Sequence, residues 1–158
     1  MITGDLIHPQ LLAAVARAGH GAHVLVLDGH YPASTAVWER ADQVFLNLAP
    51  GLLDTSTVLR VLRTAMTIES AAVMVPPVGE EEPDAVAQHV ADLPGIKVDR
   101  LDRWAFYETA RSSDVALAIV TGDIRTYANL LLTVGVRRVA SNDDQSLARR
   151  SGTSGETS

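Results

Sequence analysis

Three of the five histidines, His20, His23 and His30, lie near Asp28 in the sequence. Imidazole and carboxylate groups that lie together can bind a metal ion or transfer protons. However, no two of these histidines have the i, i+4 spacing that places both on one helix face, and side chains along a strand alternate in direction. The spacing therefore specifies no shared metal site. We expect no metal and no cofactor, and we interpret His23 as a structural side chain.

His20 stands between Gly19 and Gly21, so the backbone there can adopt shapes that branched residues avoid. Such a bend can present an imidazole to solvent, and an imidazole with its ordinary pKa near 6.5 can give and take protons at neutral pH. The alternative is a helix C-cap, with Gly19 in the left-handed conformation, followed by an exposed histidine without a role. We interpret His8 as a helix-start residue and His89 as a helix-surface residue.

Asp28 directly follows an apolar run at 23–27, which is typical of a buried strand. Open α/β sheets bind ligands at the carboxyl ends of their strands, and a carboxylate there can accept two hydrogen bonds from sugar hydroxyl groups. Asp28 also precedes Gly29, and the alternative is that it only forms a turn. His30 lies in the loop that follows.

A second polar segment follows the apolar run at 115–120 and ends in Tyr127, Ala128 and Asn129. An asparagine side chain both donates and accepts hydrogen bonds, which matches hydroxyl groups. Phosphate binding is the alternative, but a single glycine beside the acidic Asp123 makes a poor anion-binding loop. No nucleophile-elbow or phosphate-loop motif is present.

A third segment, 103–108, places Arg103 beside the aromatic residues Trp104, Phe106 and Tyr107. An aromatic wall next to a guanidinium suits a sugar ring, whose faces are apolar and whose edges carry hydroxyl groups. The alternative is that these aromatic side chains pack in an ordinary core, as most helix aromatics do.

The apolar periodicity and the positions of proline and glycine predict the elements that carry these segments. Helices are expected at 9–18, 58–66, 83–91 and 103–111, with Asp102 as the N-cap of the last. Strands are expected at 23–27, 71–75, 96–101 and 115–120. The run at 130–136 fits a strand or a helix, and its short length favours a strand. Short apolar strands that alternate with helices predict an α/β fold with three layers, α/β/α, and a mostly parallel central sheet.

The composition excludes several classes of protein. The 158 residues are 47% hydrophobic and carry a net charge of −6, so we expect no nucleic-acid partner. Without cysteine there is no thiolate nucleophile, disulfide or cysteine-rich metal site. No apolar run is long enough to cross a membrane, and the start does not read as a signal peptide, so we predict a cytoplasmic protein. One domain is expected over 1–140, followed by a disordered polar tail at 141–158.

Taken in order, these segments resemble the RbsD/FucU family of sugar mutarotases, the D-ribose pyranases and L-fucose mutarotases. The resemblance extends to about Val139, and the segment at 103–108 is similar to the L-fucose branch. It is carried by Gly19, His20, Gly21, Asp28, His30, Pro32, Arg103, Ala105, Phe106, Tyr107, Glu108, Thr121, Gly122, Tyr127 and Asn129.

The resemblance implies an RbsD-like fold and an isomerase that interconverts the α and β anomers of a free monosaccharide without a cofactor. It implies that His20 is the proton donor. It also implies that Asp28, Arg103 and the segment Tyr127, Ala128, Asn129 bind the sugar, with His30 and Tyr107 as further pocket residues. The chain departs from the family pattern at Ala22 and Asp123, where the family often has an acidic residue and a glutamate, and at Trp104, which replaces a smaller aromatic. These departures bear on which sugar is bound.

The predicted strand at 23–27 separates His20 from Asp28 by roughly 17 to 20 Å, at about 3.3 Å per residue. One monosaccharide cannot touch both within one chain unless the loops fold far back. We therefore expect a homo-oligomer in which His20 of one subunit completes the pocket that holds Asp28 of another, in agreement with the ring-shaped assemblies of the family. The alternatives for function are a D-ribose pyranase and a non-catalytic monosaccharide-binding protein.

Overall fold

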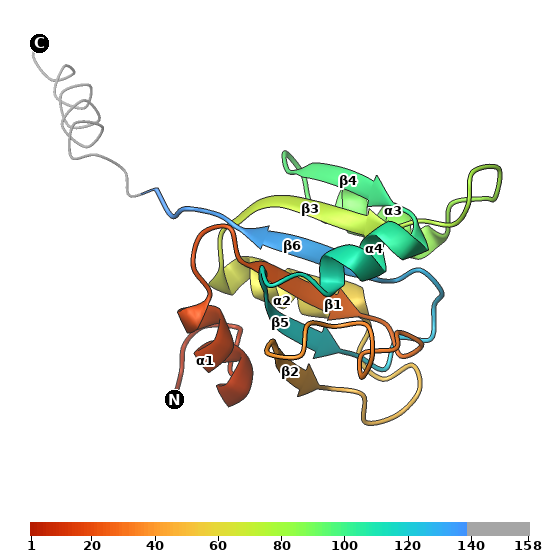
Figure 1. Cartoon of the computed structure of the whole chain (residues 1–158). Helices are drawn as coiled ribbons and strands as arrows, with labels where there is room; N and C mark the ends of the chain where they lie inside the picture. The colour runs from red at the N-terminus through yellow and green to blue at the C-terminus, as the bar shows by residue number, and fades with distance from the viewer. Residues whose placement is uncertain (139–158) are drawn as a thin grey trace, which may run out of the picture.

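The computed structural model of the protein describes residues 1–138. A six-stranded sheet forms its centre (Figure 1). The helices are α1 (Pro9–Arg17), α2 (Thr55–Ala65), α3 (Asp84–Ala91) and α4 (Arg103–Ala110). The strands are β1 (His23–Leu27), β2 (Asp42–Phe45), β3 (Ile68–Met74), β4 (Lys97–Leu101), β5 (Val115–Val120) and β6 (Leu130–Val134).

The strand order is β2-β5-β1-β6-β3-β4. Three neighbouring pairs, β2/β5, β5/β1 and β3/β4, are parallel, and β6 runs antiparallel to both β1 and β3. A parallel return needs a crossover of a dozen or more residues, and the connection from Val120 to Leu130 is shorter than that. The predicted mostly parallel sheet is therefore confirmed, with β6 reversed because its connection is short.

The reversal of β6 decides what lies at each edge of the sheet. β6 begins at the edge where β1 and β3 end, so the segment 127–129 lies beside Asp28. It ends at the opposite edge, where the backbone N–H of Gly21 donates to the carbonyl of Val134 at 2.9 Å. We call these the carboxyl edge and the amino edge, after β1.

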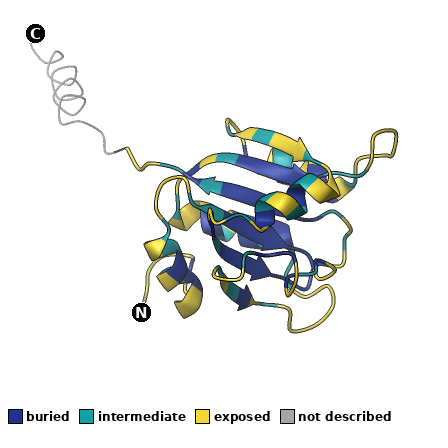
Figure 2. Cartoon of the chain, viewed as in Figure 1, coloured by how far each residue is buried: buried dark blue, intermediate teal, exposed yellow. Residues whose placement is uncertain are grey.

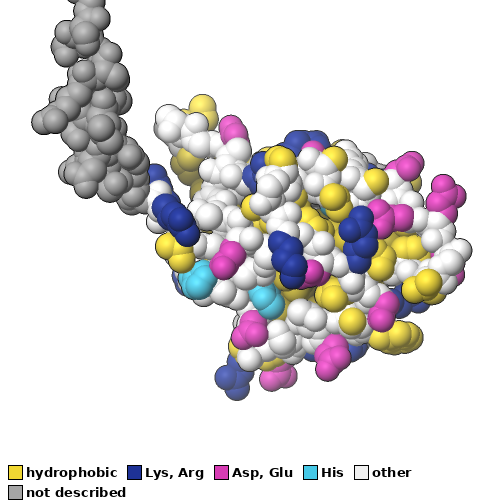
Figure 3. Space-filling view, turned by 90° about the horizontal axis from the view of Figure 1, so that it is seen from above, with side chains coloured by type: hydrophobic (Ala, Val, Ile, Leu, Met, Phe, Trp, Pro, Cys, Tyr) yellow, Lys and Arg dark blue, Asp and Glu magenta, His cyan; other side chains and the backbone are white. Residues whose placement is uncertain are grey.

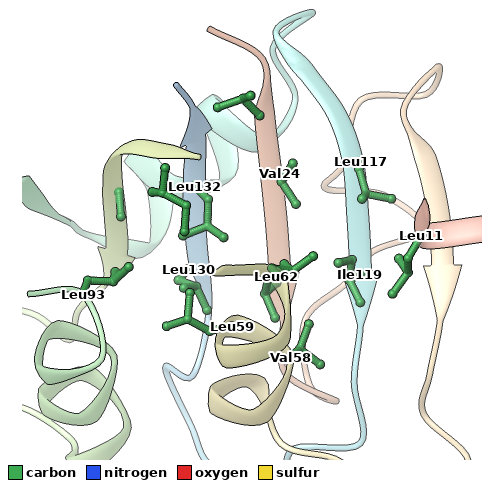
Figure 4. Close-up of a cluster of buried hydrophobic side chains, with 14 of the residues drawn as sticks. Leu11, Val24, Val58, Leu59, Leu62, Leu93, Leu117, Ile119, Leu130 and Leu132 are labelled. Atoms are coloured by element: carbon green, nitrogen blue, oxygen red, sulfur yellow. The ribbon is translucent and has the colours of Figure 1, made fainter. Parts of the chain in front are cut away.

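Two apolar clusters pack on the two faces of the sheet, which confirms the three-layer prediction. On one face α1, α2 and α3 cover side chains such as Val24, Ile119 and Leu132 (Figure 4). On the other face α4 and the loop 28–41 cover Leu25, Leu27 and their neighbours. The central strands are buried almost throughout, and the helices are exposed along one side (Figure 2).

Side chains cap three of the helices. The ring Nδ1 of His8 accepts a hydrogen bond from the N–H of Leu11, and Pro9 is the first helical residue. The interpretation of His8 as a helix-start residue is therefore confirmed. Asp54 accepts from the N–H of Thr57. Asp102 accepts from the N–H groups of Trp104 and Ala105, so its predicted role as an N-cap is confirmed.

Several expectations need correction. Strand β2 was not assigned from the sequence, because only Val44 among its four residues is buried. Gly19 is not left-handed, since α1 ends in extended backbone at Ala18 and the positive φ falls at Gly21, at 82°. His89 was expected on a helix surface, but α3 turns it inward and it is fully buried. The tail predicted at 141–158 lies outside the described residues.

Candidate functional site

A cavity of about 230 Å³ opens at the carboxyl edge of the sheet, between α4 and the segment 126–129. We call it the carboxyl-edge pocket. It brings together six of the residues selected from the sequence, from three separate stretches of the chain. Its lining is Asp28, His30, Tyr31, Met74, Arg103, Tyr107, Thr126, Tyr127 and Asn129. Ala128 is fully buried and is not part of that lining.

Asp28 and Asn129 form a reciprocal pair at the floor of this pocket. The backbone N–H of Asp28 donates to Asn129 Oδ1 at 2.9 Å, and Asn129 Nδ2 donates to Asp28 Oδ2 at 2.7 Å. Asp28 Oδ1 accepts a hydrogen bond from the N–H of His30 at 2.9 Å. Asp28 therefore forms a turn, as the alternative interpretation of the sequence proposed, and it also lines the pocket. Burial raises the pKa of the Asp28 carboxyl, and these hydrogen bonds offset part of that rise.

Arg103 and Tyr127 form the opposite side of the pocket. An Arg103 guanidinium N–H donates to Tyr127 Oη at 3.2 Å, and the guanidinium carbon lies 5.7 Å from the centre of the tyrosine ring. Tyr127 has a φ of 59°, which is an uncommon backbone conformation for a residue other than glycine. Such a conformation persists only where the surrounding structure maintains it. The two side chains also line a neighbouring cleft of about 860 Å³, which contains the exposed Trp104.

The aromatic residues of α4 have three different environments. Phe106 is fully buried in the core, as the alternative reading proposed. Tyr107 lines the carboxyl-edge pocket and packs edge-on against Tyr31, with ring centres 5.3 Å apart. Trp104 is 74% exposed and lies in the neighbouring cleft. Only Tyr107 therefore contributes to the wall of the pocket.

A buried polar network lies beneath the segment 121–129. Arg125 binds the carboxylate of Asp123 with its side chain at 2.7 and 3.0 Å. Thr55, at the start of α2, donates its hydroxyl to Asp123 Oδ2 at 2.9 Å. Burial would raise the pKa of Asp123, but the hydrogen bonds from Arg125 and Thr55 hold it well below its usual range.

The same network fixes the protonation of His89. The single hydroxyl proton of Thr55 points to Asp123, so the Thr55 oxygen accepts from His89 Nε2–H at 3.0 Å. His89 Nδ1 is buried and has no hydrogen-bond partner among the described residues. Burial, together with the charge of Arg125, lowers the pKa of His89 to about 4. His89 is therefore neutral at physiological pH, and the network ties the segment 121–129 to α2 and α3.

His20 lies at the amino edge, outside the carboxyl-edge pocket. Its side chain is 59% exposed, and its Nε2 lies 2.8 Å from Glu69 Oε2 at the start of β3. His20 lines a different and more open hollow of about 530 Å³, together with Trp38 and residues 113–116. Within one described chain, the structure does not bring His20 to the residues selected for sugar binding.

Sequence reasoning missed four residues that the structure places at these sites. Tyr31, Met74 and Thr126 line the carboxyl-edge pocket. The sequence signal for Tyr31 and Thr126 is their place in loops that already held candidates, whereas Met74 is an ordinary strand residue. Glu69 carries no local signal, because its contact with His20 spans 49 positions.

The described residues contain no group of three or more His, Asp or Glu side chains arranged to hold a metal ion. None of their helices combines the length and apolar character needed to cross a membrane. Basic and acidic side chains are interspersed over the face shown in Figure 3.

Comparison with known sequences decides the family. A sequence model of the RbsD / FucU transport protein family matches residues 1–137. The chain belongs to the RbsD/FucU family. An L-fucose mutarotase of Histophilus somni (strain 2336) is 30% identical over 139 residues, which cover 84% of this chain and 94% of that protein.

Solved structures of the RbsD/FucU family share this fold. Bacillus subtilis RbsD complexed with D-ribose superposes with a TM-score of 0.76 and 21% identity, covering 87% of this chain and 100% of that one. The fucose mutarotase of Streptococcus pneumoniae in complex with L-fucose gives a TM-score of 0.71 and 21% identity, covering 84% and 95%. The RbsD-like fold predicted from the sequence is confirmed.

One departure from the RbsD/FucU pattern now has a structural reason. Asp123 stands where the family often has glutamate, and here its carboxylate is enclosed by Arg125 and Thr55 and is 2% exposed. A longer side chain would have to displace one of these partners. Asp123 therefore holds the segment that carries Tyr127 and does not line the carboxyl-edge pocket itself.

Proposed function

We propose that this protein is a mutarotase that interconverts the α and β anomers of a free monosaccharide, with L-fucose or a related sugar as substrate. The observation that carries the proposal is the carboxyl-edge pocket, in which Asp28, Asn129, Arg103 and Tyr127 surround a small cavity. The related proteins named L-fucose mutarotase support the same activity.

The groups around the pocket suit a small polyhydroxylated ring. Asp28 offers carboxylate oxygens that accept hydrogen bonds, and Arg103 offers only donors. Tyr107 and Tyr127 add ring surfaces for the apolar face of a sugar. Because Asp28 and Asn129 already hold each other through two hydrogen bonds, these acceptors and donors are fixed before the sugar arrives, which lowers the entropic cost of binding.

The reaction needs only proton transfer. The ring oxygen gains a proton as the bond between it and the anomeric carbon breaks, and the anomeric hydroxyl loses a proton to give the open-chain carbonyl. Rotation exposes the other carbonyl face, and the same transfers in reverse close the ring. We assign protonation of the ring oxygen to His20 and removal of the hydroxyl proton to Asp28, Tyr127 or a water molecule. Positioned groups of this kind contribute about 10² to 10⁴ in rate.

The separation of His20 from the carboxyl-edge pocket supports an active site shared between subunits. Five residues of β1, hydrogen-bonded on both sides to β5 and β6, lie between His20 and Asp28. The strand therefore holds them roughly 17 Å apart. We propose a homo-oligomer in which His20 of one copy reaches the pocket of another, and we propose that this assembly acts in the cytoplasm.

Exchange between anomer signals, measured by NMR for L-fucose, D-ribose and related sugars, tests the activity. We expect the purified protein to accelerate exchange of L-fucose or a close analogue, and the His20→Ala variant to lose most of that acceleration. Acceleration confined to the pyranose–furanose exchange of D-ribose would identify a D-ribose pyranase instead. Binding of a sugar without any change in its exchange rate would identify a non-catalytic binding protein.

Mixed assemblies test the shared pocket separately. Co-expressed His20→Ala and Asp28→Ala subunits, the first with a lowered kcat and the second with a raised KM, should regain activity when they assemble together and are measured at a sugar concentration near the wild-type KM. If one subunit supplies His20 and another supplies Asp28, random mixing restores about a quarter of the pockets. The shared pocket would be contradicted by a monomeric wild-type protein with full activity, or by mixed assemblies that regain no activity. Neither result would contradict the mutarotase activity, which the NMR exchange experiment tests separately.

A further inference from the structure

We propose that the neighbouring cleft binds a second sugar ring, so that the substrates of this protein include neutral disaccharides with a free anomeric hydroxyl at the reducing end. The reducing ring lies in the carboxyl-edge pocket and the second ring lies in the cleft. This inference rests on the proposed function and extends it from a free monosaccharide to a larger class of substrate.

The neighbouring cleft lies directly beside the carboxyl-edge pocket, along the same edge of the sheet. β3 and β4 are parallel neighbours that both end there (Figure 1), and residues that follow them, Val75 and Asp102, line the cleft. The pocket lies at the end of β1 and the start of β6, and β6 is the strand next to β3. Ligands bind at the carboxyl ends of parallel strands, so the cleft occupies a place in the sheet that suits a ligand.

The two cavities share a border and differ in size. Arg103 and Tyr127 line both of them, and their volumes are about 230 Å³ for the pocket and about 860 Å³ for the cleft. Cavities that bind ligands larger than one small ring usually measure roughly 300 to 1,000 Å³. The pocket therefore suits one monosaccharide ring, and the cleft leaves room for another. Arg103 donates one N–H to Tyr127 Oη, and its remaining N–H groups can donate to hydroxyl groups of either ring.

Trp104 gives the cleft an aromatic surface for a second ring. Its side chain is 74% exposed, whereas tryptophan is highly buried on average. The indole packs edge-on against Tyr107, with ring centres 6.0 Å apart and an angle of 87° between the rings. Because Tyr107 lines the carboxyl-edge pocket, aromatic surface continues from the pocket into the cleft. Such a surface suits the apolar face of a sugar ring.

The charges of the cleft favour a neutral ligand. Its lining contains two basic side chains, Arg100 and Arg103, and two acidic ones, Glu80 and Asp102. Glu82 also binds Arg100 through two hydrogen bonds of 2.8 and 3.1 Å. The described lining therefore has no excess of positive charge to attract a phosphate. Hydroxyl groups can use both kinds of side chain, since they donate to carboxylates and accept from guanidinium groups.

The position of the reaction determines which disaccharides fit. The ring opens at the anomeric carbon of the sugar in the carboxyl-edge pocket, so that sugar needs a free anomeric hydroxyl. The second ring must be attached through another hydroxyl, and the glycosidic bond between the rings stays intact. The proton transfers are those of the monosaccharide reaction. The cleft adds binding energy without adding a chemical step.

Three disaccharides test the inference, with β-D-galactose on O-2, O-3 or O-4 of a reducing L-fucose. Anomer-exchange NMR of the reducing ring gives kcat/KM for each of them and for L-fucose. We expect at least one linkage to reach a kcat/KM as high as that of L-fucose or higher, with a lower KM. Trp104→Ala should reduce kcat/KM for that disaccharide roughly 3- to 10-fold, while the value for L-fucose stays within about twofold of wild type.

Phe45→Ala is the matched control for the loss of an exposed aromatic side chain. Phe45 is 59% exposed and lies on β2, at the opposite end of the sheet from β4. This variant should keep wild-type kcat/KM for the disaccharide and for L-fucose. The thermal unfolding midpoint of Trp104→Ala should stay close to that of wild type, because exposed substitutions change stability only slightly.

Tryptophan fluorescence measures binding separately from catalysis. The chain has two tryptophans, and the other one, Trp38, lies in the hollow with His20. A disaccharide that fills the cleft should change the emission of the wild-type protein more than L-fucose does, and this extra change should disappear in Trp104→Ala. The same titrations give Kd values, and we expect the Kd of the disaccharide to be lower than that of L-fucose.

Two results would overturn the inference. One is a protein that accelerates the exchange of L-fucose but of none of the three disaccharides, and the other is a Trp104→Ala variant that lowers kcat/KM equally for disaccharide and monosaccharide. Failure of the proposed function gives a different pattern, because L-fucose then keeps its uncatalysed exchange rate. In that case the titrations still decide: tighter binding of a disaccharide that depends on Trp104 supports the second-ring site, and binding no tighter than that of L-fucose contradicts it.

Discussion

The two edges of the sheet differ in how their polar groups are held. At the carboxyl edge, Asp28 and Asn129 are 2% and 3% exposed and bind each other through two hydrogen bonds. At the amino edge, His20 and Glu69 are both more than half exposed, and a single contact joins them. β1 connects the two edges, so one strand carries a buried, fixed site at one end and an exposed, adjustable group at the other.

This difference matches the two tasks of the proposed reaction. Groups that recognise a sugar gain from burial and fixed geometry, because rigid acceptors and donors lose little entropy on binding. A group that transfers protons needs contact with solvent to recover its starting protonation state, and the exposed side chain of His20 has that contact. The comparison also predicts that substitutions at the carboxyl edge change binding, whereas substitutions at the amino edge change the rate of the bound complex.

The largest expected effect is that of His20→Ala. Removal of the proton donor should lower kcat by about 10² to 10⁴, while KM changes little because the groups proposed to bind the sugar, such as Asp28 and Arg103, stay in place in the carboxyl-edge pocket. Saturation curves from anomer-exchange NMR measure both constants. A rise in KM with unchanged kcat would contradict the division of tasks between the two edges.

Asp28→Ala should show the opposite pattern. Loss of the carboxylate removes hydrogen bonds to the sugar and leaves Asn129 Nδ2 without its partner, so KM should rise roughly 10- to 100-fold with a smaller effect on kcat. The same exchange experiment, repeated at several sugar concentrations, gives the result. Equal losses in kcat for Asp28→Ala and His20→Ala would show that Asp28 also takes part in proton transfer.

His89→Gln tests the network that supports the carboxyl edge. The pKa of folded His89 is about 4, below its ordinary value of 6.5, so between these pH values the unfolded chain binds one more proton than the folded chain. The free energy of unfolding of the wild type should therefore fall as the pH falls from 6.5 to 4, by up to about 3 kcal/mol.

Glutamine keeps a donor for Thr55 but does not titrate, so the variant should lose that part of the pH dependence. Denaturant unfolding of both proteins between pH 4 and 7 measures the difference between their free energies of unfolding. The carboxyl groups, including Asp28, are the same in both proteins, so their contributions cancel in this difference. Parallel stability curves for the two proteins would mean that His89 titrates normally in the folded state.

Trp104→Ala should have the smallest effect. Trp104 is 74% exposed and lies in the cleft beside the pocket, and exposed substitutions away from a site usually change stability only slightly. We expect kcat/KM for a free monosaccharide to stay within about twofold of wild type, since Tyr107 supplies the aromatic wall. A large rise in KM would extend the binding site into the neighbouring cleft.

The sequence alone predicted most of the fold because its signals are local. Five of the six strands and all four helices were assigned, since apolar runs, proline positions and the Asp102 cap act within a few residues of each other. β2 was missed because it is short and has one buried residue. The inward position of His89 was missed because its hydrogen-bond partner, Thr55, is 34 positions away, and Thr55 in turn binds Asp123, which is 68 positions from Thr55.

The candidate site was likewise predicted from the sequence only in part. The polar segments after the strands at 23–27 and 115–120 were found from the sequence, because parallel strands deliver their carboxyl ends to one edge. Their exact partners were not found, since the pairing of Asp28 with Asn129 spans 101 positions. The separation of His20 from that pocket was expected, because strand geometry fixes the distance between the two ends of β1.

Residue types and strand length thus determined by themselves which groups are available for chemistry and that two of them lie at opposite ends of one strand. Only the tertiary structure decided that β6 returns antiparallel between β1 and β3, and that Glu69 of β3 lies against His20 at the amino edge. The physical reason is that pairing between distant strands depends on the length of the connections and on packing across the whole sheet, which no short stretch of sequence contains.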